Sequence, residues 1–243
     1  MQKNILITGA AKRIGAACAR FLHAQGHNIL IHYRYSKTDA ENLCSELNAI
    51  RDDSARCYAA DLSNMNELKQ LAQDAQQAWG GIDVLINNAS SFYLTDVLNT
   101  SEAQWDDLLN SNLKAPFFLS SLLADTLAKK RGCIINIADI HAERGLKNYA
   151  VYSISKAGLV MMTKVLAKEF GASIRVNAVA LGAILWHEQG MAESEQQTIL
   201  QRIILERLGD LNDVTKAISF LIQDADYMTG QVLTVDGGRT LFC

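Results

Sequence analysis

Tyr152 and Lys156 are the residues in this sequence whose types and spacing most directly suggest chemistry. They stand four positions apart in a stretch, 150–170, whose apolar pattern predicts a helix, so both side chains share one helix face. A tyrosine with its usual pKa of about 10 transfers protons poorly at neutral pH, and a nearby ammonium favours the phenolate. We therefore interpret the pair as a proton-transfer site in which Lys156 lowers the pKa of Tyr152. The alternative is an exposed helix face without function.

Asp139 and Asn112 extend this hypothesis. Asp139 follows a predicted strand, 133–138, and we expect a proton donor or substrate anchor beside Tyr152, the alternative being a loop carboxylate in water. Pro116, the only proline, lies within a helical pattern and lacks the N–H that would bond the carbonyl of Asn112. A freed carbonyl can hold a water that relays protons to Lys156. The alternative is a plain helix kink.

The turn at residues 8–15 predicts a phosphate-binding site. It joins a predicted strand to a predicted helix and contains Gly9, Lys12, Arg13 and Gly15. Glycines let a backbone approach a pyrophosphate, and a helix N-terminus attracts its charge. An ordinary strand–helix turn is the alternative, but two cations in the same turn favour a bound phosphate.

The charges after the second predicted strand, 28–33, favour NADPH over NADH. NAD-binding proteins place an acid there to hold the ribose hydroxyl, whereas this chain has no Asp or Glu before Asp39. Arg34 and Ser36 occupy the position instead, and a guanidinium binds a 2′-phosphate in bidentate fashion. A solvated basic surface is the alternative. Asp61, after the third strand, either accepts a hydrogen bond from adenine or caps the next helix, as Ser63 also would.

The bulk properties exclude several classes of protein. The 243 residues carry a net charge of −3, which gives no sign of a nucleic-acid partner. The chain has five cysteines, including Cys243, and no two of them have CxxC spacing. This pattern argues against a disulfide framework and against a metal site. No signal peptide and no apolar run of about 20 residues are present. We expect a soluble cytoplasmic protein without a membrane segment.

Short apolar runs alternate with amphipathic stretches along the whole chain. This order predicts βαβ units and a parallel sheet covered on both faces. We expect one doubly wound, Rossmann-type α/β domain, 1–243, with a seven-stranded sheet, a binding site beyond the carboxyl ends of its strands, and a substrate-binding loop or lid over 181–208. The predicted strands are 4–8, 28–33, 55–60, 82–87, 133–138, 174–180 and 231–235, and the predicted helices are 13–25, 38–50, 63–79, 101–130, 150–170 and 211–222.

Taken together, these motifs resemble the short-chain dehydrogenase/reductase superfamily over nearly the whole chain. The resemblance rests on Gly9 and Gly15, Asn87-Asn88-Ala89-Ser90, Asn112, Tyr152 with Lys156, and the closing Asp236-Gly237-Gly238. It implies that the tyrosine is the acid/base, that the lysine also binds the nicotinamide ribose, and that the chain forms a homotetramer. The cofactor-binding residues that we expect from motif and resemblance are Gly9, Lys12, Arg13, Ile14, His32, Tyr33, Arg34, Ser36, Asp61, Leu62, Asn88, Ala89, Ser90, Tyr152, Lys156 and Gly182.

Departures from the common pattern resemble the pteridine reductase branch. Arg13 stands where most members have a glycine, Ser90 ends a motif that usually ends in glycine, and Asp139 replaces the usual catalytic serine. The resemblance implies that a pterin or folate stacks between Phe92 and the nicotinamide of NADPH, while Asp139 and Tyr152 supply the proton. The implied substrate-binding residues are Arg13, Ser90, Phe92, Asp139, Tyr149 and Tyr152.

Segments 139–145 and 184–188 are similar to bacterial dihydromonapterin reductases within that branch, although an ordinary variable loop is the alternative. We hypothesise reduction of a dihydropterin, and of dihydrofolate as a further substrate, to the tetrahydro form. One alternative is a reductase of carbonyl substrates such as 3-oxoacyl thioesters, which the loss of a neutral hydroxyl at Asp139 disfavours. Another is a non-catalytic NADP(H) sensor, which Tyr152, Lys156 and Asn112 disfavour. Three of these residues also have interpretations without function. Phe92 could be a core aromatic, and His141 and His187 could be surface residues.

Overall fold

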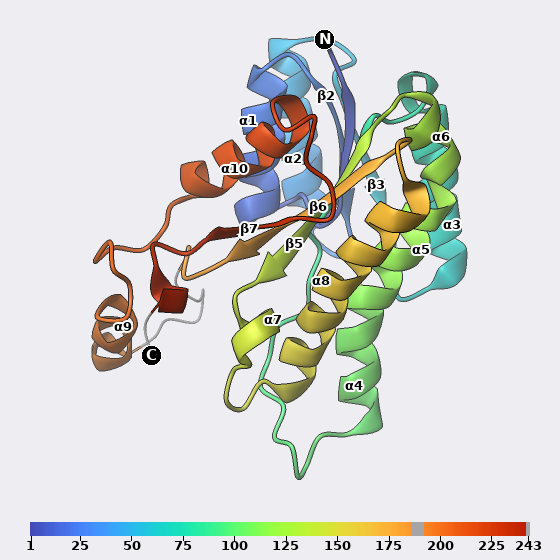
Figure 1. The fold of residues 1–243 in the computed structure, drawn as a ribbon. Helices are drawn as coiled ribbons and strands as arrows, with labels where there is room; N and C mark the ends of the chain where they lie inside the picture. The colour runs from blue at the N-terminus through green and yellow to red at the C-terminus, as the bar shows by residue number, and fades with distance from the viewer. Residues whose placement is uncertain (186–191, 242–243) are drawn as a thin grey trace.

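A seven-stranded, entirely parallel sheet forms the centre of the molecule (Figure 1). The computed structural model describes residues 1–185 and 192–241. The strand order β3-β2-β1-β4-β5-β6-β7 confirms the predicted doubly wound sheet, and the order reverses between β1 and β4. All carboxyl ends therefore meet at one edge. The strands are β1 (Asn4–Ile7), β2 (Asn28–Tyr33), β3 (Ala55–Ala59), β4 (Val84–Asn87), β5 (Cys133–Asp139), β6 (Arg175–Leu181) and β7 (Val232–Val235).

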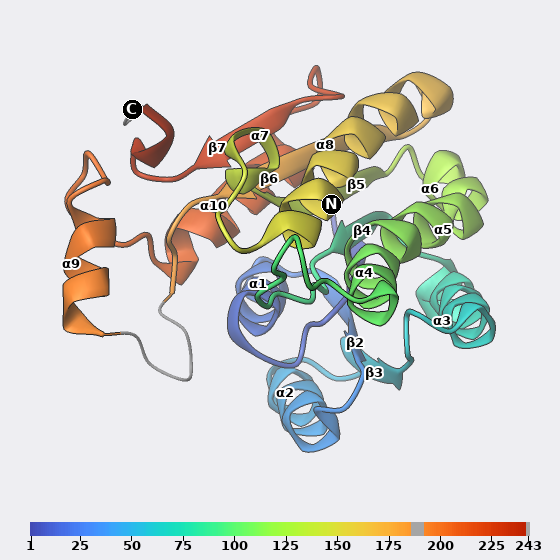
Figure 2. The same cartoon turned by 90° about the horizontal axis from the view of Figure 1, so that it is seen from below.

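Helices cover both faces of this sheet (Figures 1 and 2). One layer consists of α1 (Arg13–Ala24), α2 (Lys37–Ile50) and α10 (Leu211–Gln223), and the other of α3 (Met65–Gln77), α4 (Glu102–Leu109), α5 (Ala115–Leu122), α6 (Ala124–Lys129) and α8 (Ala150–Phe170). The short α7 (His141–Arg144) and α9 (Glu193–Leu200) lie beyond the carboxyl ends of the strands, so they border the predicted binding edge.

The strands are continuously apolar because each of them serves two cores. In β1, Ile5 and Ile7 pack with residues of α1, α2 and α10, while Leu6 packs with residues of α3, α5 and α8. All three are fully buried. Alternate side chains of a strand point to opposite faces, so this double packing explains the unbroken apolar runs. Burying each such side chain contributes about 2–3 kcal/mol.

The predicted helix 101–130 is not continuous. The interruption near Pro116 is also not the plain helix kink that was the alternative interpretation of this proline. A π-helical segment, Asn110–Lys114, separates α4 from α5, and the Ala115 N–H bonds to the Asn110 carbonyl. Pro116 lies in the first turn of α5, where a missing N–H costs little. This arrangement places Asn112 in the π turn, a feature that often marks functional sites.

The long helix α8 carries both Tyr152 and Lys156 and belongs to the core. In the described part of the chain it is the one helix long and apolar enough to cross a membrane, with a mean hydropathy of 1.2. More than half of its most apolar window is buried within the protein, and it packs against β5 and β6. Core packing therefore accounts for its apolarity.

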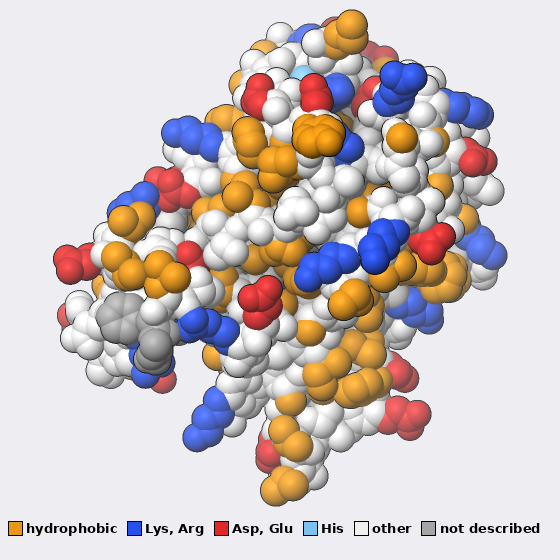
Figure 3. Space-filling model, viewed as in Figure 1, with side chains coloured by type: hydrophobic (Ala, Val, Ile, Leu, Met, Phe, Trp, Pro, Cys, Tyr) orange, Lys and Arg blue, Asp and Glu red, His pale blue; other side chains and the backbone are white. Residues whose placement is uncertain are grey.

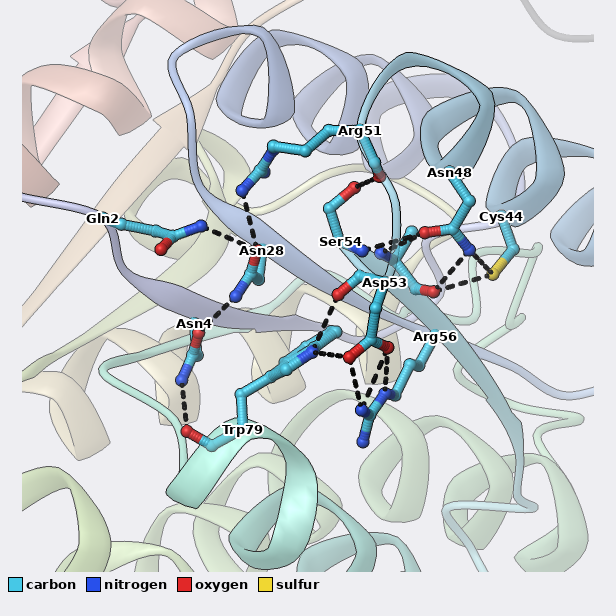
Figure 4. Close-up of polar contacts among 11 residues, drawn as sticks. Gln2, Asn4, Asn28, Cys44, Asn48, Arg51, Asp53, Ser54, Arg56 and Trp79 are labelled. Atoms are coloured by element: carbon cyan, nitrogen blue, oxygen red, sulfur yellow. Dashed lines mark hydrogen bonds and ion pairs between the residues drawn. The ribbon is translucent and has the colours of Figure 1, made fainter.

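The loop between α2 and β3 is fixed by side-chain amides (Figure 4). Asn48 Oδ1 accepts from the backbone N–H groups of Ser54 and Ala55, both at 2.9 Å, and its Nδ2 donates to the Ala55 carbonyl at 2.8 Å. Trp79 Nε1 donates to the Asp53 carbonyl of the same loop at 2.9 Å. Because this loop leads into the amino end of β3, it lies at the edge opposite the binding edge.

Replacing Asn48 by alanine removes these three backbone contacts at once. We expect the free energy of unfolding, measured by urea denaturation, to fall by about 2–3 kcal/mol, because partly buried backbone groups lose their partners. Gln70→Ala is the matched control, since it deletes an exposed amide that donates a solvent-exposed hydrogen bond to Asp74, and should change stability by less than about 0.5 kcal/mol. Equal stability of the two variants would contradict this account of the loop.

Candidate active site

A cavity of about 400 Å³ opens beyond the carboxyl ends of β1, β2, β3 and β4. No side chain caps the N-terminus of α1 beside it, and its first turn contains no acid, so the first N–H groups remain suited to an anion. This is a fit for the pyrophosphate of a dinucleotide. The predicted cofactor-binding residues that line this cavity are Gly9, Lys12, Arg13, Ile14, His32, Arg34, Asp61, Leu62, Asn88, Ala89 and Ser90.

The phosphate turn needs its glycines, and it holds Arg13 in an unusual conformation. Gly9 has φ +61°, and a Cβ there would lie 3.0 Å from the Cα of Ala89. A Cβ on Gly15 would lie 2.4 Å from the Gly9 carbonyl oxygen. Arg13 has φ +52°, which costs a residue with a Cβ about 1–2 kcal/mol. This explains why a glycine suits the position, and a strained arginine here indicates a use for its side chain.

His32 holds the phosphate turn from beneath. Its Nδ1 accepts from the Gly9 N–H at 3.0 Å, so Nε2 carries the proton and donates to the Ala60 carbonyl at 3.0 Å. The ring is 2% exposed, and burial lowers its pKa to about 4. Since the protein engages both ring nitrogens, His32 acts on the cavity by shaping Gly9.

Arg34 and Asp61 meet at the far end of the same cavity. Their side chains form an ion pair of 2.6 Å, and the guanidinium lies 4.7 Å from the centre of the Tyr35 ring. Burial opposes the charge of Asp61, yet hydrogen bonds from Ser63 and the nearby Arg34 hold its pKa below the usual range. Asn64 caps α3 through its side chain, so the expectation that Asp61 or Ser63 caps this helix is wrong. 

Five expected cofactor residues lie outside this cavity, and Tyr152 and Lys156, described below, are two of them. Ser36 stands at the N-cap of α2 without a side-chain capping bond, and among the described residues neither it nor Tyr33 lines the cavity. Gly182 borders a second cavity, and a Cβ at this position would lie only 2.6 Å from the Cβ of Asp236. Lys12 lines the cofactor cavity while paired with Asp39 at 3.1 Å.

Tyr152 and Asp139 form the polar centre of the site. The Tyr152 hydroxyl donates to Asp139 Oδ2 at 2.9 Å, and the His141 backbone N–H donates to Asp139 Oδ1 at 2.8 Å. Tyr152 is 5% exposed, and burial, together with the Asp139 charge, raises the pKa of its phenol well above the usual range. The expected lowering of this pKa by Lys156 is therefore not found, because burial and the Asp139 carboxylate raise the pKa instead.

Lys156 lies beside Tyr152 as the spacing predicts, but it is anchored to the sheet. Its Nζ donates to the Ile137 carbonyl of β5 at 2.8 Å and lies 5.7 Å from the centre of the Tyr152 ring. The side chain is 3% exposed, and burial lowers its pKa to about 8, with Asp139 opposing the shift. At neutral pH the group remains mostly protonated.

Asn112 ties the loop after β4 to α8 through its side chain, a role that the sequence did not indicate. Oδ1 accepts from the Ser91 N–H at 2.9 Å and from the Ser90 hydroxyl at 3.1 Å. Nδ2 donates to the Ser91 carbonyl and to the Ser155 hydroxyl, both at 3.0 Å. The predicted water relay concerned the backbone carbonyl of Asn112 and stays a prediction.

A second cavity, of about 270 Å³, adjoins Asp139. Phe92 and Tyr149 stack beside it with ring centres 4.5 Å apart, and the Tyr152 ring meets Phe92 edge-on at 4.6 Å. The predicted substrate residues Phe92, Asp139, Tyr149 and Tyr152 are thus together, while Arg13 and Ser90 line the first cavity. Arg239 also lines this wall and was missed as a site residue, and His141, for which a surface position was the plainer alternative, lines it too.

Three further expectations concern the rest of the chain. In the described ranges no cluster of His, Cys, Asp or Glu has a geometry suited to a metal, and Cys18, Cys44, Cys57 and Cys133 are free. Of the expected lid, 181–208, six described residues line the second cavity: Leu181, Gly182, Ala183, Ile184, Leu185 and Ile199. Trp186, His187, Glu188 and Cys243 lie outside the described residues.

In sequence, the chain is similar to known reductases. The family model described as enoyl-(acyl carrier protein) reductase matches residues 9–240. The 3-oxoacyl-[acyl-carrier-protein] reductase of Staphylococcus epidermidis is 33% identical over 98% of this chain and 99% of its own length. Pteridine reductase 1 of Leishmania tarentolae is 34% identical over 97% of this chain and 96% of its own length. The 3-oxoacyl-[acyl-carrier-protein] reductase of Thermotoga maritima is 35% identical over 98% of both chains.

The buried His32 makes stability depend on pH. Its folded-state pKa of about 4 lies below the unfolded value of about 6.5, so the unfolded chain takes up this proton first as pH falls. His32 therefore contributes about 3 kcal/mol at neutral pH that is lost as pH falls from about 6.5 to 4. In urea denaturation across this window, His32→Asn should flatten the pH dependence relative to wild type, although His23 and His27, with pKa values also lowered by burial, retain part of it. Identical slopes would refute the assignment.

Proposed function

Because the chain belongs to the short-chain dehydrogenase/reductase superfamily and is an oxidoreductase, we propose that it is an NADPH-dependent pteridine reductase. The substrate is a dihydropterin, with dihydrofolate as a further candidate, and the product is the tetrahydro form. The observation that carries this proposal is the Asp139 carboxylate hydrogen-bonded to Tyr152 beside the stacked Phe92 and Tyr149. A carboxylate at this position suits protonation of a ring nitrogen.

The first cavity suits NADP(H) by shape and charge. The uncapped N-terminus of α1 and the Gly9 turn would hold the pyrophosphate, and Arg34 with Lys12 would hold the 2′-phosphate. The resemblance assigns the nicotinamide ribose to Lys156. When bound, NADPH supplies the hydride.

The residues of the chain control the proton. Burial and the Asp139 charge keep the Tyr152 phenol protonated, so Tyr152 is a donor. A phenolate left beside a carboxylate would be unfavourable, and we infer that Asp139 takes up a proton from the second cavity and passes it along the 2.9 Å hydrogen bond. In the dihydropterin, the C=N carbon gains the hydride and the nitrogen gains this proton. The buried Lys156 ammonium balances the negative charge nearby.

Phe92 gives the substrate site an apolar face for a flat heterocycle. Phe92 is 37% exposed although Tyr149 stacks on one face of its ring, and this is a large apolar surface to leave at the mouth of a cavity. Stacking of a planar ring on an aromatic face is favourable, and Ser90 and Arg13 supply polar groups at the adjoining cavity. A flexible acyl chain gains less from such a surface.

Reduction of a 3-oxoacyl thioester is the second candidate. It is supported by the 3-oxoacyl-[acyl-carrier-protein] reductases at 33–35% identity. On this scaffold a carbonyl oxygen would accept its proton from Tyr152 with a neutral neighbour at position 139. The Asp139 carboxylate disfavours this because its charge would oppose the developing alkoxide.

A substrate panel separates these two candidates. With NADPH, wild type should reduce dihydromonapterin, dihydrobiopterin or dihydrofolate, and reduce acetoacetyl thioester slowly. Asp139→Ser restores the usual superfamily residue and should lower kcat for the pterin about 100-fold, because the proton supply is lost. Tyr152→Phe is the control that should retain NADPH binding while losing turnover. Turnover of the thioester alone would overturn the proposal.

We also propose that the protein is a cytoplasmic homotetramer. Support comes from apolar side chains that gather on the exposed faces of α4, α5 and α8 (Figure 3). Exposed apolar area of this kind often marks a subunit interface. The exposed residues there are Trp105, Phe117, Phe118, Ile154, Met161 and Val165.

Met161 tests this interface because it is 57% exposed on α8. Met161→Glu places a charge in the proposed contact and should shift the molar mass measured by light scattering from tetramer towards smaller species. Tyr227→Glu, at a fully exposed residue outside these helices, is the matched control and should leave the mass unchanged. A monomeric wild type would contradict the proposal.

A further inference from the structure

The second cavity contains a cation that the proposed mechanism does not use. Arg239 begins the short helix η3 (Arg239–Leu241) that follows β7, and its side chain lines the cavity with Asp139, Phe92 and Tyr149. Among the described residues that line this cavity, it is the only lysine or arginine. The cavity therefore combines an acid at one position with a permanent cation at another.

The guanidinium of Arg239 lacks a fixed acceptor. Within the described ranges its side chain makes no hydrogen bond and no ion pair, and only its backbone N–H is bonded, to the Asp236 carbonyl at 3.2 Å. The nearest acids are already engaged. Asp139 accepts from His141 and Tyr152, and Asp236 accepts from the backbone N–H groups of Gly238 and Thr240.

The surroundings make this unpaired state unfavourable. Arg239 is partly buried, and its removal from water lowers its pKa, while Asp139 attracts the charge and the neighbouring Arg202 repels it. A guanidinium carries five N–H donors, and a desolvated donor without an acceptor costs free energy. A ligand that brings oxygen atoms into the cavity would remove this cost. His141 is a poorer candidate, because burial lowers its pKa and its Nδ1 lies 3.2 Å from the Gly145 carbonyl.

The position of Arg239 relates it to one part of the substrate. In a dihydropterin, the carbon of the reducible C=N bond also bears the variable substituent. Asp139 and Tyr152 mark where the proton arrives at this bond, and Asp139 shares its cavity with Arg239. The substituent on the reacting carbon would therefore lie in the cavity that Arg239 lines.

We propose that Arg239 is a specificity-determining residue that binds an oxygen-rich substituent on the reacting carbon of the substrate. Hydroxyl groups of a polyol chain and the oxygens of a phosphate share the acceptor chemistry that a guanidinium recognises. This inference rests on the proposed function and narrows the substrate to dihydropterins with polar side chains. A dihydropterin with a plain methyl substituent leaves the guanidinium unpaired.

The test uses three substrates that share one ring: a methyl-substituted dihydropterin, dihydroneopterin and dihydroneopterin monophosphate. For wild type, kcat/KM should be at least about tenfold higher for the two oxygenated substrates than for the methyl one. Arg239→Gln should lower kcat/KM about tenfold for the oxygenated substrates and leave the methyl one within about threefold. A larger loss for the phosphate than for the hydroxyls identifies the anion as the preferred ligand, and equal losses identify the hydroxyls.

Two further variants keep the test specific. Arg202→Gln removes an exposed cation near Arg239 that does not line the cavity, and it should retain the wild-type preference. Arg239→Lys keeps the positive charge but loses the planar guanidinium with its paired N–H donors. This variant should retain more activity with dihydroneopterin monophosphate than with dihydroneopterin. NADPH affinity, measured by fluorescence titration, should be unchanged in all variants and reports that they are folded.

The outcomes separate this inference from the function on which it rests. If Arg239→Gln lowers kcat/KM equally for all three substrates, or for none, the assignment of Arg239 is overturned while pterin reduction stands. If wild type reduces no pterin but reduces the thioester, the proposed function is overturned and this assignment with it.

Discussion

The hydrogen bond between Tyr152 and Asp139 is the interaction on which the rest of the site depends. It joins the first turn of α8 to the end of β5, and two other contacts fix the same junction. The His141 N–H holds the second oxygen of Asp139, and Lys156 is anchored to the Ile137 carbonyl. Phenol, carboxylate and ammonium are therefore held by one strand end and one helix. Burial gives this small group its chemical character, because it raises the pKa of the phenol and lowers that of the ammonium.

In the proposed reaction, one cavity would hold the cofactor and the other the substrate. The first, at the carboxyl ends of β1 to β4, has the shape and charge of a dinucleotide site, with Gly9 shaped from beneath by His32. The second adjoins Asp139 and carries Phe92 and Arg239 on its walls. A parallel sheet makes this arrangement possible because all of its carboxyl ends meet at one edge. Relatives at similar identity are named 3-oxoacyl-[acyl-carrier-protein] reductase or pteridine reductase, so overall similarity does not distinguish the two activities.

The sequence predicted the fold and much of the site because both depend on local patterns. Apolar runs located all seven strands, the Gly9 turn lines the first cavity after β1, and Tyr152 meets Asp139 at the end of β5. What failed depends on contacts between distant parts of the chain. The sign of the Tyr152 pKa shift followed from burial, which spacing does not reveal. Arg239 was missed because the end of the chain returns to β5 only in three dimensions. Asn112 was expected in the site, but its side-chain hydrogen bonds to Ser91 were not, because they join different elements.

The central claim is that burial and Asp139 hold Tyr152 in its protonated form. NMR titration of the cofactor-free protein, labelled at its tyrosines and assigned with Tyr152→Phe, measures this directly. The account predicts that Tyr152 stays protonated above the usual tyrosine pKa of about 10, and that Asp139→Asn lowers its pKa relative to wild type. Ionisation of wild-type Tyr152 at or below about pH 10 would contradict the account, because it would mean that Lys156 outweighs burial and the carboxylate.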